Sequence, residues 1–139
     1  MTLDTQLPAS STVFTAERRF TQAEFDRFAE ISGDDNPIHV DPVFSSQTRF
    51  GRTVAHGMLL YTALRGVIAT HFPGMRQLTQ SLMFPAPTFA EETLRLEVEV
   101  LDYPSAKECR LAMRILRAAD ATLTLEGETC IALDRETGA

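Results

Sequence analysis

Cysteine, tryptophan and basic side chains are scarce in this chain of 139 residues, which has two cysteines and no tryptophan. Cys109 and Cys130 lie in separate strand-like segments and neither belongs to a CxxC or Cys/His pattern, so we expect neither a disulfide framework nor a bound metal. The 13 basic residues are outnumbered by 19 acidic ones, which gives a net charge of −6. This balance excludes sequence-independent nucleic-acid binding, which requires clustered lysine and arginine.

Long apolar runs are also absent. The longest, Met58 to Ala69, is interrupted by Arg65 and is shorter than the ~20 residues that a membrane-spanning helix needs. Residues 1–11 are polar and lack the apolar segment of an export signal. We therefore expect a cytoplasmic protein without a membrane partner, with residues 1–11 as a flexible tail and residues 12–139 as one domain.

The first half of the chain has helical patterns. Thr21 to Glu24 spells a capping box, and Gly33 is suited to end the helix that follows it. Asp41 and Pro42 resemble a second helix start, with the aspartate as cap and the proline in the first turn. The segment from Gly57 to about Thr70 is apolar on nearly every side, which predicts a central helix surrounded by protein.

The second half changes to a period of two. Apolar and polar residues alternate over residues 94–100, 110–115 and 123–133, which predicts three long antiparallel strands with one wet face. Shorter strands are expected at residues 13–20 and 76–84, and Gly127 suggests a bulge in the last strand. Helices first and meander strands later indicate an α+β fold in which a curved sheet wraps around the apolar helix. The apolar sheet edge favours a homodimer or a higher homo-oligomer.

The segment Ser32 to His39 reads Ser-Gly-Asp-Asp-Asn-Pro-Ile-His. A carboxylate and an imidazole on one rigid loop can hold a water between them, with Asp34 accepting its proton and His39 orienting it. Asn36 can tie the loop to its own backbone. Taken alone, this motif is more often an ordinary turn after a helix, with His39 packed beneath the next one.

A second motif, His56-Gly57-Met58, stands at the entrance of the apolar helix. The amide of Gly57 would be an unpaired donor at a positive helix end, suited to a thioester oxygen that gathers negative charge. The plainer alternative is that Gly57 permits tight packing and His56 caps the helix.

Together, Ser-Gly-Asp-x-Asn-Pro-x-His and the later His-Gly-Met resemble the MaoC-like, or (R)-specific enoyl-CoA hydratase, family of hotdog-fold proteins. The resemblance runs from about Phe14 to Leu133. It implies an antiparallel sheet wrapped around a central helix, with Asp34 and His39 as the catalytic pair and Gly57 as the oxyanion-binding amide. It departs at Glu91-Glu92, where family members commonly have Gly-Asp.

Further site residues are expected around these two motifs. The resemblance also suggests Asn36 and His56 beside the substrate, and Thr62 as the family's helix serine, able to hydrogen-bond Asp34. Arg49 and Arg52 are candidates to bind the phosphates of coenzyme A; the alternative is that both are solvated, as such arginines more often are.

The resemblance implies hydration of a trans-2-enoyl thioester of coenzyme A or acyl carrier protein to a 3-hydroxyacyl thioester. No metal or redox cofactor is expected, and coenzyme A enters only as part of the substrate. Two alternatives stay open, because a fold does not fix a function. One is thioester hydrolysis on the same fold, and the other is a non-catalytic acyl-binding or assembly subunit.

Overall fold

In the computed structural model, which describes residues 6–133, five strands form one antiparallel sheet in the order β1-β3-β4-β5-β2. The strands are β1 (Val13–Arg18), β2 (Arg76–Met83), β3 (Leu94–Ser105), β4 (Glu108–Arg117) and β5 (Leu123–Ala132). All five strands predicted from the sequence are present. The short strands β1 and β2 form the two edges of the sheet.

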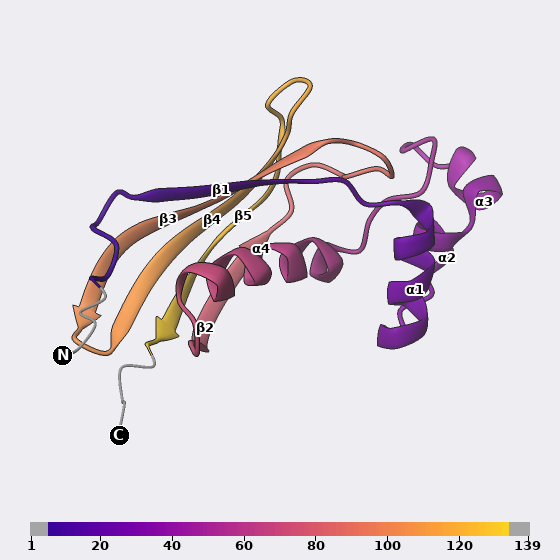
Figure 1. The fold of residues 1–139 in the computed structure, drawn as a ribbon. Coiled ribbons are helices and arrows are strands. Elements are labelled where there is room, and N and C mark those ends of the chain that lie inside the picture. Colours follow the sequence, from indigo (N-terminus) through magenta and orange to yellow (C-terminus); the bar gives the residue numbers. More distant parts are fainter. Residues whose placement is uncertain (1–5, 134–139) are drawn as a thin grey trace.

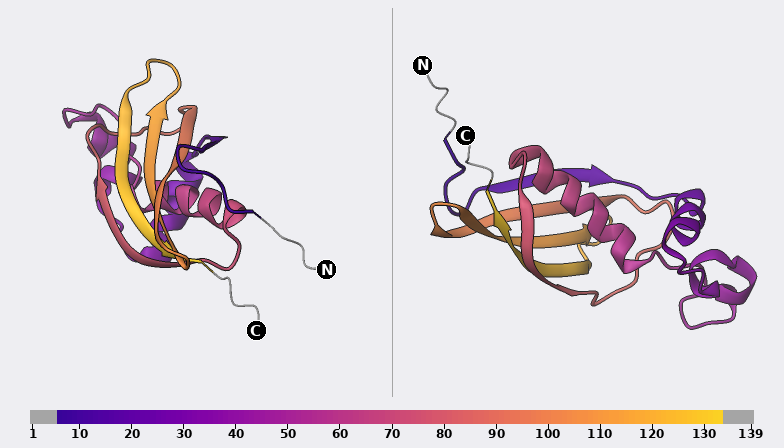
Figure 2. Two further views of the ribbon diagram at one scale, coloured as in Figure 1. Left: turned by 90° about the vertical axis from the view of Figure 1, so that its left-hand side faces the viewer. Right: turned by 90° about the horizontal axis from the view of Figure 1, so that it is seen from below.

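The apolar helix α4 (Gly57–His71) lies across the concave face of this sheet, which curls around it (Figures 1 and 2). Its buried residues meet the inward-facing residues of the long strands in one core. The prediction that protein surrounds α4 is wrong for the single chain, because Thr62, Gly66 and Thr70 are exposed along one side. The residues of α4 that are buried are Leu59, Leu60, Tyr61, Leu64 and Ile68.

Three further helices extend beyond one end of the sheet (Figure 1). Thr21 caps the first with both hydrogen bonds of a capping box, and Gly33 ends it with a φ of 82°, as the sequence predicts. Asp41 caps the third. A helix between them was not predicted, and the Asn36 side chain caps it by accepting from the Ile38 amide. The helices are α1 (Gln22–Ser32), α2 (Pro37–Val40) and α3 (Pro42–Ser46).

Gly127 does not form the predicted bulge. The pairing of β4 with β5 shifts at Thr124 instead, since Ile115 faces Leu125 and the next residue of β4 faces Leu123. The glycine has a different role, because a side chain there would collide with the backbone carbonyl oxygen of Ser81 in β2. It therefore allows the edge strand to approach closely.

Part of the predicted tail is attached to the sheet. The Tyr103 hydroxyl donates to the carbonyl of Pro8, and the amide of Ser11 donates to Val100 at 2.7 Å. Residues 1–5 of that tail and residues 134–139 lie outside the described part of the chain. Within the described part, no helix has the length and apolar character needed to cross a bilayer.

Candidate active site

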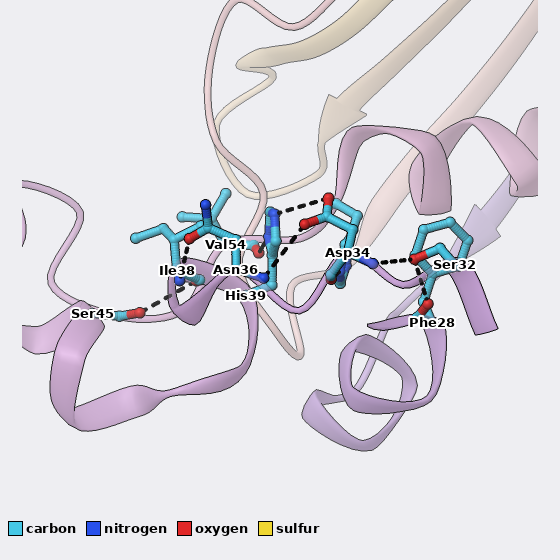
Figure 3. A network of polar contacts seen from close by, with 9 residues as sticks. Phe28, Ser32, Asp34, Asn36, Ile38, His39, Ser45 and Val54 are labelled. Carbon is cyan, nitrogen blue, oxygen red and sulfur yellow. Dashed lines mark hydrogen bonds and ion pairs between the residues drawn. The ribbon is translucent and has the colours of Figure 1, made fainter. Parts of the chain in front are cut away.

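Asp34 and His39 face each other at the end of α1 and in α2 (Figure 3). Asp34 directly follows the glycine that ends α1, and the Asn36 cap and Pro37 set the course of the next turn. The Nε2 atom of His39 lies 3.7 Å from Oδ2 of Asp34. The carboxylate is about half exposed whereas the imidazole is largely covered, with side-chain exposures of 55% and 15%. The motif therefore folds into a partly open acid–base pair.

The hydrogen bonds of His39 determine its tautomer. Its Nδ1 atom lies 2.7 Å from the carbonyl oxygen of Val54, and because a carbonyl only accepts, Nδ1 must carry a proton. In the neutral ring Nε2 is then unprotonated and directs its lone pair at Asp34. Two acceptors 3.7 Å apart suit a molecule that donates to both, as water does.

His56 supports this pair from beneath and is 2% exposed. Its Nε2 atom donates to the carbonyl oxygen of Asp34 at 2.9 Å. Its ring stacks on that of His39 with centroids 3.9 Å apart, and it meets Phe28 edge-on. Burial lowers the pKa of His56, and His39 makes a smaller contribution in the same direction. The hydrogen bond to the Asp34 carbonyl raises this pKa but does not offset the effect of burial. His56 is thus a neutral ring that positions both members of the pair.

One group of side chains in the described residues has enough ligand atoms close together to hold a metal ion. It consists of Asp34, His39 and His56, whose ligand atoms lie within 4.8 Å of one another. Their arrangement does not suit one. The two imidazole planes are only 20° from parallel and stacked, so their in-plane lone pairs do not converge on a shared point. Nδ1 of His39 and Nε2 of His56 are in addition committed to carbonyls.

The amino end of α4 lies beside this group, since His56 is its N-cap and Gly57 its first residue. The His56 side chain makes no capping bond, and no hydrogen bond from the described residues reaches the Gly57 amide. This donor is therefore available at the positive end of a helix. The ring of Phe84 covers the glycine, because a Cβ built there would lie 2.6 Å from its Cζ atom. Only glycine fits beneath the ring in this position.

A pocket of about 550 Å³ lies beside this group of residues. Asp34, His56 and Gly57 line it together with the exposed Met58 and Phe84, whereas His39 and Asn36 are not among the lining residues. No sequence motif pointed to the two buried threonines in its wall. The other lining residues are Phe28, Ser32, Arg49, Phe50, Val54, Ala55, Leu60, Pro85, Ala86, Pro87, Thr88 and Thr124.

Two further predicted site residues, Thr62 and Arg52, lie away from the acid–base pair. Thr62 is exposed on α4 and its hydroxyl donates to the carbonyl of Leu59 rather than to Asp34. Arg52 pairs with Glu92 at 3.6 Å and covers the ring of Phe89, outside the pocket lining. Arg49, by contrast, lines the pocket beside Phe50. The one-turn spacing that suggested Thr62 does not ensure that its side chain faces Asp34.

Comparison with known proteins agrees with the motifs. Residues 4–115 match the family model described as the MaoC like domain. The chain is 38% identical over 119 residues to an (R)-specific enoyl-CoA hydratase of Aeromonas caviae, covering 84% of this chain and 88% of that protein. It is 32% identical over 112 residues to a 3-hydroxybutyryl-CoA dehydratase of Methylorubrum extorquens, covering 78% and 70%.

Solved structures show the same fold. The (R)-hydratase of Aeromonas caviae superimposes with a TM-score of 0.86 at 34% identity, covering 93% of this chain and 99% of that one. An R-hydratase of Pseudomonas aeruginosa also superimposes with a TM-score of 0.86, at 30% identity, covering 93% of this chain and 84% of that one. The predicted hotdog fold, a sheet wrapped around a central helix, is confirmed. Because the family model matches residues 4–115 and a 38% identical relative covers 84% of the chain, the chain belongs to the MaoC-like family.

Proposed function

We propose that this chain is a hydro-lyase that reversibly hydrates a trans-2-enoyl thioester to the (R)-3-hydroxyacyl thioester. The observation that carries the proposal is the pair of acceptors, Asp34 Oδ2 and His39 Nε2, 3.7 Å apart beside an unpaired helix amide. Relatives named as an enoyl-CoA hydratase and a 3-hydroxybutyryl-CoA dehydratase support it. The substrate is a thioester of coenzyme A or of acyl carrier protein.

The chemistry follows from what each group can donate or accept. A water held by both acceptors loses a proton to Asp34 while its oxygen bonds to C3 of the enoyl group. The electrons of the C2–C3 double bond move towards the thioester oxygen, which the Gly57 amide stabilises as it becomes negative. The proton held by the Asp34–His39 pair then passes to C2, so the elements of one water are added and the enzyme is restored. None of these steps uses a metal or a redox cofactor.

We propose that Arg49 meets a phosphate of coenzyme A. Its support is that Arg49 lines the pocket, whereas Arg52 is paired with Glu92.

We also propose a homodimer. Its support is the edge strand β2, which exposes Leu78 and Met83 to 43% and 58%. Sedimentation equilibrium tests this, with twice the mass of the chain expected and a monomer contradicting it. The unpaired thiols of Cys109 and Cys130 support a cytoplasmic location.

The test of function is incubation with crotonyl-CoA. We expect loss of the absorbance of the conjugated thioester, formation of (R)-3-hydroxybutyryl-CoA and no free thiol. Release of coenzyme A, detected with a thiol reagent, would instead indicate a thioesterase. A protein that binds the thioester and changes it in neither way would be a non-catalytic acyl-binding subunit.

A further inference from the structure

The inner wall of the pocket carries hydroxyl groups that the hydration chemistry does not need. Exposed residues such as Met58 and Phe84 mark the mouth, and the buried residues mark the inner end. An acyl chain whose thioester oxygen reaches the Gly57 amide would extend along this buried wall. The buried lining residues are Ala55, His56, Leu60, Thr88 and Thr124.

Thr88 has a hydroxyl without a partner. The residue is 2% exposed, and its Oγ1 atom is fully buried with no hydrogen bond to any part of the described chain. The hydroxyl of Thr124 differs, because it donates to the carbonyl of Ile115 at 3.3 Å. Leaving a buried hydroxyl unpaired is unfavourable where valine would fill the same volume. A ligand group that hydrogen-bonds to Thr88 removes this cost.

His56, which also lines the pocket, has a complementary unpaired atom. The amide of Ala55 donates to the carbonyl of Thr88 at 2.8 Å, which places Thr88 next to the residue before His56. The Nδ1 atom of His56 is likewise buried and without a partner in residues 6–133. Because Nε2 of His56 carries the proton, Nδ1 is an acceptor. The same wall therefore offers a hydroxyl that can donate and a ring nitrogen that accepts.

Charge limits what can bind there. The charged lining residues in the described chain are Asp34 and Arg49, and both are exposed at the mouth. A carboxylate at the inner end would lose its hydration without meeting a cation. A neutral oxygen avoids that cost, and a hydroxyl can both accept from Thr88 and donate to an acceptor.

We propose that Thr88 determines substrate specificity and that the pocket takes 2-enoyl thioesters with a neutral oxygen, a hydroxyl first of all, just beyond the double bond. This inference rests on the proposed hydration of an enoyl thioester and adds the class of acyl group. The hydroxyl of Thr88 replaces the water that the substrate oxygen loses on entry.

The test compares two substrates of nearly equal shape, trans-4-hydroxy-2-butenoyl-CoA and trans-2-pentenoyl-CoA, which differ by a hydroxyl in place of a methyl group. The measured quantity is the ratio of their kcat/KM values. We expect the wild type to favour the hydroxy substrate and Thr88→Val to lower the ratio by roughly five- to tenfold, the size of one hydrogen bond. Thr70→Val is the matched control, since Thr70 is exposed on α4 and donates to Gly66, and its ratio should equal that of the wild type.

Two results separate this inference from the function it rests on. A wild type that hydrates neither substrate nor crotonyl-CoA contradicts the proposed function and the inference with it. A wild type that hydrates both substrates, with the same ratio in Thr88→Val, overturns the inference alone and means that a buried water satisfies Thr88. If the valine variant does not fold, Thr88→Ala and Thr88→Ser replace it, and equal ratios in these two overturn the inference as well.

Discussion

His56 binds the main chain of Asp34 and leaves its carboxylate free, with Nε2 donating to the Asp34 carbonyl oxygen at 2.9 Å. The same ring is stacked on His39. One buried side chain therefore fixes both members of the acid–base pair without taking part in their proton transfer. This separates a positioning role, which depends on the hydrogen bond and the stack, from a catalytic one.

Replacing His56 tests that role. His56→Phe keeps an aromatic ring against His39 but loses the bond to Asp34, and we expect kcat to fall by roughly tenfold, the value of one or two hydrogen bonds, with KM little changed. His56→Gln retains a donor and should recover part of the loss. Steady-state kinetics with crotonyl-CoA measures both. An equal loss in the two variants would show that the donor to Asp34 does not matter.

Stability should depend on pH through His56. Burial lowers its pKa below the ordinary 6.5, so the unfolded chain takes up a proton at a pH where the folded one does not. The contribution of His56 is complete above 6.5 and is lost as the pH falls below that value towards the lower pKa of the folded state. Urea unfolding at about pH 7.5 and about pH 5.5 gives the fall in the free energy of unfolding between the two pH values. This fall should be smaller in His56→Gln than in the wild type. The same loss in both proteins would contradict the shift.

Gly57 provides both an amide and space for the Phe84 ring. In Gly57→Ala the new methyl group would push this exposed ring into the pocket, so we expect kcat/KM to fall. The free energy of unfolding should change by less than about 1 kcal/mol, since alanine suits a helix better than glycine. Adding Phe84→Ala should restore kcat/KM to the level of Phe84→Ala alone. Failure of this rescue would show that the ring is not the reason for the glycine.

Gly127 should matter for stability rather than for chemistry. A methyl group there meets the backbone of Ser81, which cannot rotate away, so Gly127→Ala should lower the free energy of unfolding by about 1–3 kcal/mol. Gly66→Ala is the control, because open space surrounds that exposed position on α4, and it should be neutral or stabilising by up to about 1 kcal/mol. Urea midpoints compare the two variants, and equal midpoints would contradict the close approach of β2.

Local sequence signals predicted most of the fold. The capping box at Thr21, the left-handed Gly33 and the Asp41-Pro42 helix start depend on neighbours within a few residues, and all three appear as expected. The period of two located the three long strands β3, β4 and β5. The helix α2 was missed although Asn36-Pro37 has the same cap-and-proline pattern as Asp41-Pro42, so its signal was present and was read only as a turn.

What the sequence could not provide are contacts between distant segments. The stack of His39 on His56 joins residues 17 positions apart in sequence, and no local pattern encodes it. The bulge was expected at a glycine, but the strand pairing shifts at Thr124 because register depends on both partners. Thr88 shows no motif at all, since an unpaired hydroxyl is recognised only when everything around it is known.

The carboxylate of Asp34 is the group that activates water in the proposed hydration. Asp34→Asn keeps the size of the side chain and its backbone contacts but cannot take a proton from water, so kcat for crotonyl-CoA hydration should fall by about 100- to 10,000-fold. Binding of the saturated analogue butyryl-CoA, measured by calorimetry, should stay within a few-fold of the wild type. An Asp34→Asn protein with wild-type kcat would contradict the proposal that this carboxylate activates the water.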